Sequence, residues 1–212
     1  NLFSDRDIIR LGPPFLQKPL AWYIANKRAP KSQKLYEQIG GGSPLTRITL
    51  AQAQSLNTYL DKNSDREFFT TVAMRYWHPN ADQAIQQLID AGVDRLILLP
   101  LYPHYSIATS GSSLKDFDSR LFLSELSEQV ADPVVIQSWQ DDPGYTKCLA
   151  NKILQGMTQF NNEDVTLLYS AHSLPVSFIN EGDPYVDHLE QTIEAVEKIT
   201  GIKGKLCYQS RS

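Results

Sequence analysis

The sequence predicts an α/β fold in which helices flank a parallel β-sheet, and two observations lead to this prediction. From about residue 49 onward, segments with strand character alternate with segments of helical periodicity, and strands joined through helices run parallel in one sheet. Residues 96–101 are apolar throughout, which is typical of a strand buried on both faces of such a sheet.

The first part of the chain is less regular. We expect a helix near residues 16–26 and a turn at Gly40-Gly41-Gly42-Ser43-Pro44. Thr49 and Gln52 have the spacing of a capping box, in which two side chains satisfy free amides at the start of a helix. Leucines at helical spacing follow, so the pattern predicts a helix that starts at Thr49.

The next elements form a strand–helix–strand unit. Residues 68–74 are rich in β-branched and aromatic side chains, which predicts a strand. Asn80 is suited to cap the following helix, and Gly92 stands where a glycine often ends one. A second strand is expected over residues 94–101.

The same alternation continues to the end of the chain. Asp142-Pro143 and Asp183-Pro184 each place a capping side chain before a proline, which is favoured at a helix start. We expect helices over residues 113–128, 142–157 and from 183 onward, alternating with strands at 133–139, 165–170 and 206–208.

The polar segment Asn161-Asn162-Glu163-Asp164 lies between a helix and a strand, and it is the expected domain boundary. We therefore expect a first lobe over residues 1–162 and the start of a second lobe over residues 163–212. Because the chain starts with Asn1 and closes on strand-like residues, we expect sequence to be missing at both ends.

Composition and charge exclude several classes of protein. Lys and Arg number 20 against 24 Asp and Glu, for a net charge of −4, whereas nucleic-acid binders show a basic excess. The longest apolar stretch, residues 96–101, is far shorter than the about 20 residues of a membrane span. Cys148 and Cys207 are too few for a disulfide scaffold or a structural zinc site, and they fit a reducing cytoplasm.

Candidate ligand-binding residues follow the expected strands, and ligands of open α/β sheets bind beyond the carboxyl ends of strands. Three of the four histidines and several aromatic residues fall there, at residues 75–79, 102–106, 139 and 171–175. Imidazole offers a proton acceptor or a metal ligand near neutral pH, and aromatic rings offer flat apolar contacts. The pattern favours a flat, apolar ligand whose chemistry involves a metal.

The histidines also have structural explanations. His172 is the strongest candidate, because a polar ring directly after an apolar strand needs a polar role. His78 and His104 would equally serve as hydrogen-bonding groups in loops, and His188 is expected on the solvated side of a helix.

Two segments of small residues likewise have both a structural and a functional explanation. The glycine-rich residues 40–44 form either a plain turn or a loop that approaches a ligand closely. Residues 109–113 either bind an anion at a helix N-terminus or simply cap the helix. They lack the spacing and the lysine of a nucleotide-binding loop.

The motifs at these positions resemble those of the ferrochelatase family, whose members insert Fe²⁺ into a porphyrin at the end of haem synthesis. The similarity runs through essentially the whole chain. It is carried by S-A-H-S-L-P at 170–175 with N-E-G-D-P-Y at 180–185, L-Y-P-H-Y-S at 101–106 with T-S-G-S-S at 109–113, M-R-Y and H-P within 74–79, G-G-G-S-P at 40–44 and Y-Q-S-R at 208–211. Together these ordered motifs are highly specific.

The resemblance implies a chelatase-like fold of two Rossmann-like lobes with a porphyrin cleft between them, the second lobe being incomplete here. His172 would be the active-site histidine, which takes protons from the pyrrole nitrogens or binds the incoming iron. Six further residues would line the porphyrin site, the approach to the metal or the cleft wall: Arg28, Tyr36, Ser43, Arg75, Tyr76 and Trp139.

The resemblance also implies Fe²⁺ and a porphyrin as substrates, with no organic cofactor. Ile107 stands where some relatives bind an iron–sulfur cluster through cysteine, so no cluster is expected. The family's catalytic glutamate would lie beyond Ser212, and Gln140, Asp141 and Asp142 replace the paired histidines of some relatives.

Two alternatives stay open: a porphyrin-binding lobe without chelatase activity, and a related chelatase that inserts cobalt or nickel into another tetrapyrrole. The sequence leaves open whether the porphyrin is protoporphyrin IX or coproporphyrin III. It also leaves open the oligomeric state and a peripheral contact with a membrane, whereas a cytoplasmic location is expected.

Overall fold

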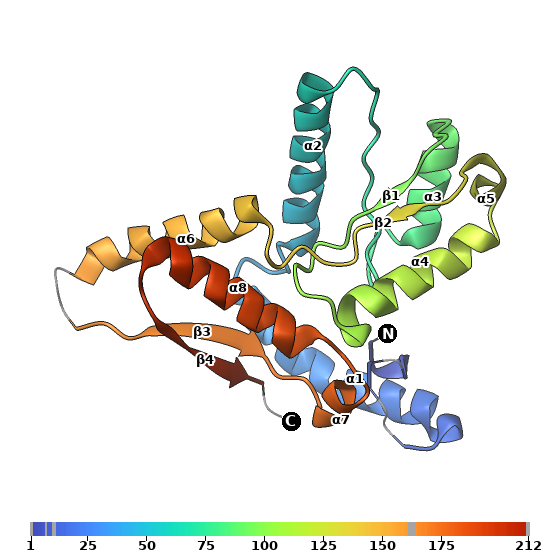
Figure 1. The fold of residues 1–212 in the computed structure, drawn as a ribbon. Coiled ribbons are helices and arrows are strands. Elements are labelled where there is room, and N and C mark those ends of the chain that lie inside the picture. Colours follow the sequence, from blue (N-terminus) through green and yellow to red (C-terminus); the bar gives the residue numbers. More distant parts are fainter. Residues whose placement is uncertain (1, 7, 10–11, 161–163, 211–212) are drawn as a thin grey trace. The chain divides into compact units, whose positions relative to one another are not determined.

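The computed structural model describes residues 2–6, 8–9, 12–160 and 164–210 (Figure 1). Its helices are α1 (Pro14–Glu37), α2 (Leu45–Asn63), α3 (Ala81–Asp90), α4 (Ser112–Phe122), α5 (Leu126–Gln129), α6 (Pro143–Met157), α7 (Val176–Asn180) and α8 (Tyr185–Thr200). Its strands are β1 (Ile97–Leu98), β2 (Val134–Val135), β3 (Leu167–His172) and β4 (Gly204–Gln209). Short helical turns cover Leu2–Ser4, Ile107–Gly111 and Thr158–Phe160.

The chain divides into two compact units. The first comprises Asn1–Leu98 and Ser112–Val135, and the second comprises Leu99–Gly111 and Ile136–Ser212. The lobe boundary expected at residues 162–163 lies outside the described residues, and that division stays a prediction.

The first unit contains a parallel strand pair and an apolar core. In the β1–β2 pair, Ile97 lies opposite Val134 and Leu98 opposite Val135. Helices α3, α4 and α5 bury one cluster of apolar side chains with the strand region: Ala81, Ala84, Ile85, Leu88, Leu96, Leu98, Phe117, Leu121, Leu126 and Val130. Burial of this apolar surface holds the three helices and β1 together.

The second unit is built on a longer parallel pair. Strands β3 and β4 pair from Leu167 opposite Gly204 to His172 opposite Gln209. Helices α7 and α8 connect the two strands, and α8 packs against α6. Both sheets are therefore parallel, as the α/β prediction requires.

Local signals in the sequence are confirmed at several helix ends. The Asn80 side chain accepts the Gln83 N–H, and the Gln83 side chain accepts the Asn80 N–H, which is a capping box at the start of α3. Gly92 follows this helix with φ +66°, a left-handed conformation that favours glycine. Asp142 caps α6 by accepting the Tyr145 N–H.

The strand expected at residues 68–74 is wrong. These residues have no regular secondary structure and pair with no strand among the described residues. The Thr70 N–H donates instead to the Asn57 side chain, and the Met74 N–H donates to the carbonyl of Pro79. The strands expected at residues 94–101 and 133–139 shrink to the two-residue strands β1 and β2.

Two helix predictions also need correction. Helix α2 starts at Leu45, whose N–H is accepted by the Ser43 hydroxyl, so Thr49 lies inside the helix and caps nothing. The helix expected over residues 113–128 is broken between α4 and α5. There the Ser124 hydroxyl donates to the carbonyl of Leu121, which closes the first helix locally.

Among the residues that the structure describes, no helix combines the length and the apolar character that crossing a bilayer requires.

Candidate functional site

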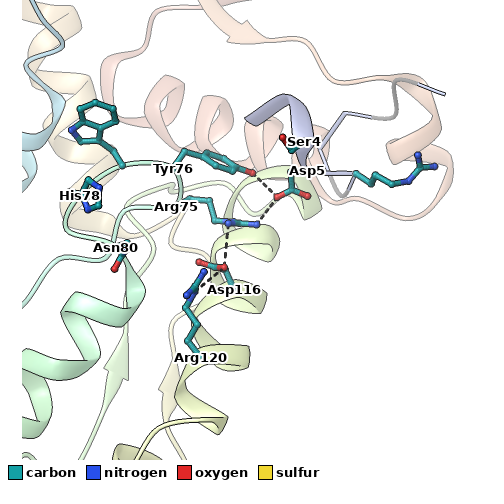
Figure 2. Close-up of a pocket in the computed structure, with 10 residues that line it drawn as sticks. Ser4, Asp5, Arg75, Tyr76, His78, Asn80, Asp116 and Arg120 are labelled. Carbon is teal, nitrogen blue, oxygen red and sulfur yellow. Dashed lines mark hydrogen bonds and ion pairs between the residues drawn. The ribbon is translucent and has the colours of Figure 1, made fainter. Parts of the chain in front are cut away.

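A pocket of about 660 Å³ opens in the first unit (Figure 2). Its walls come from the N-terminal segment, from the loop before α3 and from α4. The lining residues are Ser4, Asp5, Arg6, Arg75, Tyr76, Trp77, His78, Asn80, Asp116 and Arg120. The pocket thus contains Arg75 and Tyr76, two of the residues that the sequence singled out.

The guanidinium group of Arg75 is held on three sides. Its Nη2 lies 2.6 Å from Oδ2 of Asp5, and its Nη1 lies 3.3 Å from Oδ1 of Asp116. Its Nε donates to the hydroxyl of Ser112 at 3.1 Å. With two carboxylates as partners, the Arg75 charge is already compensated, and its orientation is fixed.

Tyr76 is bound to the same carboxylate. Its hydroxyl donates to Oδ2 of Asp5 at 2.7 Å, and the Arg75 guanidinium carbon lies 4.7 Å from the centre of its ring. Burial, together with the hydrogen bond to the Asp5 carboxylate, raises the pKa of Tyr76 to about 12. The phenol therefore stays protonated and acts as a hydrogen-bond donor at physiological pH.

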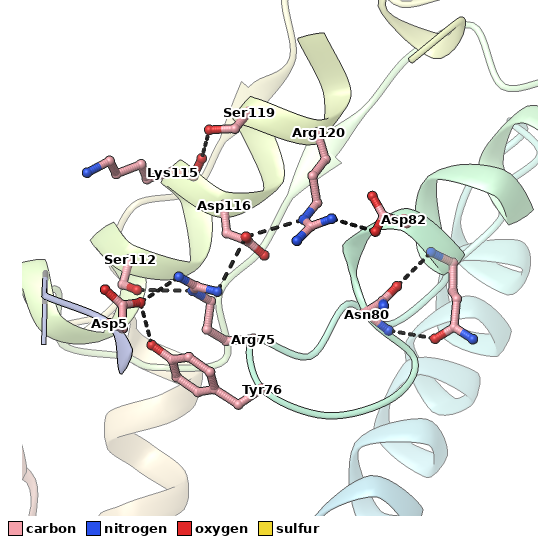
Figure 3. A network of polar contacts seen from close by, with 11 residues as sticks. Asp5, Arg75, Tyr76, Asn80, Asp82, Ser112, Lys115, Asp116, Ser119 and Arg120 are labelled. Atoms are coloured by element: carbon pink, nitrogen blue, oxygen red, sulfur yellow. Dashed lines mark hydrogen bonds and ion pairs between the residues drawn. The ribbon is translucent and has the colours of Figure 1, made fainter. Parts of the chain in front are cut away.

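The ion pairs continue along the pocket wall to the start of α3 (Figure 3). Oδ1 of Asp116 also lies 3.3 Å from Nε of Arg120, and Arg120 pairs with Asp82 at the start of α3. Two guanidinium groups thus face three carboxylates along this chain. The excess of one negative charge makes the network a poor site for an anion.

Three other expected porphyrin contacts lie on α1 and the loop after it. Arg28 and Tyr36 are exposed on α1, and Ser43 is exposed in the glycine-rich loop. The guanidinium carbon of Arg28 lies 5.6 Å from the centre of the Phe3 ring. The described hydrogen bonds join Arg75 with Tyr76 through Asp5, but they do not join either to these three residues.

His172 is the last residue of β3 in the second unit. It is exposed, and the next residue, Ser173, donates its N–H to the carbonyl of Gln209 at 3.0 Å, which extends the strand pairing past the histidine. Burial raises the pKa of Tyr185, and a hydrogen bond with the His172 backbone opposes that rise. The backbone of His172 is therefore held, while its imidazole stays accessible at the carboxyl end of a parallel strand.

His104 and His188 have structural roles in this unit. Nε2 of His104 lies 2.8 Å from the Thr192 hydroxyl. Burial, and secondarily the nearby His188, lowers the pKa of His104 to about 4. His188 is half-buried, and its Nδ1 accepts the Tyr105 N–H at 3.1 Å. The expectation that His188 is solvated is therefore wrong.

Trp139 is fixed by both its backbone and its ring. Its indole Nε1–H donates to the carbonyl of Pro100 at 2.9 Å, and its backbone N–H donates to the carbonyl of Pro103 at 2.9 Å. Its ring meets the edge of the Tyr145 ring with 4.9 Å between centres. The result is a rigid aromatic side chain beside the segment that follows β1.

Sequence reasoning missed Asp5, the residue on which both pocket candidates converge. Asp5 lies 70 residues before Arg75 and 71 before Tyr76. An isolated acidic residue in an irregular segment gives no periodic or motif signal, so only the fold reveals the contact.

In the part of the chain that the structure describes, no group of three or more His, Cys, Asp or Glu residues is arranged to hold a metal ion.

Comparison with known proteins decides the family. A sequence model described as Ferrochelatase matches the chain over residues 1–212. The chain belongs to the ferrochelatase family. Among its relatives, proteins named ferrochelatase from Desulfotalea psychrophila, Geotalea daltonii and Gloeobacter violaceus are 51%, 45% and 44% identical over 212, 214 and 216 residues.

Each of these ferrochelatase matches covers the whole of this chain. The chain in turn spans 65% of the length of each of these curated relatives. Family membership and the α/β fold with parallel strands are thus confirmed, whereas the roles of the individual ferrochelatase site residues stay predictions.

Proposed function

We propose that the full-length protein containing this chain is a ferrochelatase, which inserts Fe²⁺ into a porphyrin and so forms haem. The match to the family over residues 1–212 carries the proposal. The position of His172 supports it, because the exposed imidazole stands at the carboxyl end of β3, where ligands of parallel sheets bind.

The reaction requires two events at the centre of the porphyrin. Fe²⁺ forms bonds to the four pyrrole nitrogens, and the two N–H protons leave for a base and then for solvent. The flat macrocycle must bend so that the nitrogen lone pairs face the metal. A rigid site that fits the bent form better than the flat form lowers the barrier.

His172 supplies the base in this proposal. A neutral imidazole accepts a proton near physiological pH, and the strand pairing next to His172 keeps its backbone from moving with the substrate. The same nitrogen is able to bind the incoming iron before it enters the ring. The proposal keeps both roles for His172.

The porphyrin is held by other side chains. Arg28 is exposed on α1, and its guanidinium suits a charge-assisted hydrogen bond to a propionate. Tyr36, Ser43 and Trp139 provide aromatic and hydroxyl contacts. Arg75 already has two carboxylate partners, so we assign it and Tyr76 a contact with the porphyrin rather than the neutralisation of a propionate.

Fe²⁺ and the porphyrin are the substrates, and the proposed reaction uses no organic cofactor. The resemblance places Ile107 where some relatives bind an iron–sulfur cluster through cysteine, so we propose an enzyme without such a cluster. Cys148 and Cys207 are free thiols, which suits a reducing cytoplasm.

The test is metal insertion by the full-length protein without oxygen. Protoporphyrin IX and coproporphyrin III are each offered with Fe²⁺, and formation of the iron porphyrin is followed by absorption. Turnover with either porphyrin supports the proposal, and the ratio of the two rates identifies the substrate. A shifted porphyrin band without metallation would point to a binding protein, and faster insertion of Co²⁺ or Ni²⁺ into another tetrapyrrole would point to a related chelatase.

A further inference from the structure

We propose that Asp5 is a positioning residue, which holds Arg75 and Tyr76 in the wall of the pocket and thereby sets how tightly the porphyrin binds. The inference rests on the proposed function, since it assumes that Arg75 and Tyr76 contact the porphyrin.

Both side chains converge on one oxygen. Oδ2 of Asp5 accepts a hydrogen bond from Nη2 of Arg75 at 2.6 Å and from the Tyr76 hydroxyl at 2.7 Å (Figure 3). The guanidinium also lies against the Tyr76 ring. The three side chains therefore form a closed group in which a shift of the carboxylate moves both partners.

Asp5 is itself held in place by the segment around it. The buried side chain of Gln17 in α1 donates through Nε2 to the carbonyls of Phe3 and Ile9, each at 2.8 Å. Arg6 donates to the carbonyl of Gly12 at 2.7 Å. These bonds fix the backbone on both sides of Asp5, and its side chain is only 11% exposed.

Loss of the Asp5 charge has a different consequence for each partner. Arg75 keeps Asp116 and Ser112, so the guanidinium stays in the pocket but loses its shortest contact. The Tyr76 hydroxyl loses its charged acceptor. Both side chains gain rotameric freedom, which must be given up again when a ligand binds. We therefore expect weaker porphyrin binding, with little change in the chemical step.

The test compares variants of the full-length protein. Asp5→Asn removes the charge at nearly constant shape, and Asp5→Glu keeps the charge but moves the carboxylate by one methylene. Asp82→Asn is the matched control, because Asp82 belongs to the same chain of ion pairs but contacts Arg120 on an exposed surface. KM and kcat are measured with the porphyrin as the varied substrate.

Asp5→Asn should raise KM for the porphyrin about tenfold while kcat stays within about twofold. Asp5→Glu should raise KM about threefold, and Asp82→Asn should leave both constants unchanged. Wild-type KM in the Asp5 variants would overturn the proposal. If Asp5→Asn fails to fold, Asp5→Glu alone decides between these results.

A second readout separates this inference from the proposed function. The phenol of Tyr76 is titrated by NMR with ring-labelled tyrosine, and its signal is assigned by its loss in Tyr76→Phe. In Asp5→Asn the ionisation of Tyr76 should begin at a lower pH than in the wild type, because the negative acceptor that raises its pKa is gone, yet at a higher pH than for an exposed tyrosine, because burial remains. An unchanged titration would contradict a positioning role even if the wild-type protein inserts no iron.

Discussion

The carboxylate of Asp183 accepts a hydrogen bond from the hydroxyl of Ser106 at 2.8 Å, across 77 residues of chain. The same oxygen accepts the Ile107 N–H at 2.7 Å, and the other oxygen accepts the Tyr185 N–H at 3.0 Å. Asp183 is 5% exposed, so these three donors compensate a buried charge. They tie the segment after β1 to the start of α8, the helix that leads from α7 to β4.

Asp183→Asn should therefore destabilise the protein by about 2 kcal/mol, because an amide cannot satisfy all three donors. The free energy of unfolding of the full-length protein is measured in urea. Glu190→Gln is the matched control, since Glu190 is exposed on α8, and it should change the value by less than about 0.5 kcal/mol. Equal stability of the two variants would show that the Asp183 contacts contribute nothing.

Stability should also fall in mild acid because of His104. Burial, and then the nearby His188, lowers the pKa of His104 to about 4 in the folded protein, against about 6.5 in an unfolded chain. Between these values the unfolded chain binds a proton that the folded protein excludes. The stability of the folded protein is therefore unaffected by the protonation of His104 above pH 6.5, and it decreases as the pH falls from 6.5 toward 4.

Urea unfolding at pH 7 and pH 5 measures that loss. His104→Gln keeps a group that is able to bond to Thr192 but removes the titration, so its stability should change less between the two pH values than that of the wild type. An identical pH dependence in the variant would assign the loss to other groups.

The core of the first unit offers a pair of leucines for a packing test. Leu126 is 0% exposed within the apolar cluster, whereas Leu123 is 83% exposed three residues earlier. Leu126→Ala should lower the free energy of unfolding by about 3 kcal/mol through lost burial and a cavity. Leu123→Ala should lower it by less than about 0.5 kcal/mol, and a similar loss in both variants would contradict the described core.

Features that depend on neighbouring residues were predictable from the sequence. The cap at Asn80, the glycine at Gly92 and the Asp142-Pro143 start of α6 each act within one helical turn, and all are confirmed. The capping box at Thr49 failed because Pro44 and Ser43 start the helix earlier. A capping motif thus has no effect when residues before it have already started the helix.

Features that depend on distant partners were less predictable. Residues 68–74 have strand composition, yet a strand needs a second strand to bond with, and Thr70 bonds to a helix side chain instead. Strands β1 and β2 are likewise shorter than the strands expected at residues 94–101 and 133–139. Composition gives the tendency to extend, but pairing is a property of the fold.

In the candidate site, too, local features were predictable from the sequence and contacts between distant residues were not. His172 was found because it follows a strand within a long motif, and β3 does place it at a carboxyl end. Asp5 was missed because its partners lie 70 and 71 residues away. The sequence predicts Asp183 only as a helix cap, but in the structure its carboxylate also accepts hydrogen bonds from Ser106 and Ile107.

The rate of iron insertion by His172→Ala in the full-length protein tests the proposed function most directly. We expect kcat to fall about 100-fold or more, the scale of losing a positioned base, while porphyrin still binds and the melting temperature is unchanged, because His172 is exposed. Leu123→Ala, a surface variant, should keep the wild-type rate. Wild-type turnover by a folded His172→Ala protein would contradict the assignment of His172 as the catalytic histidine.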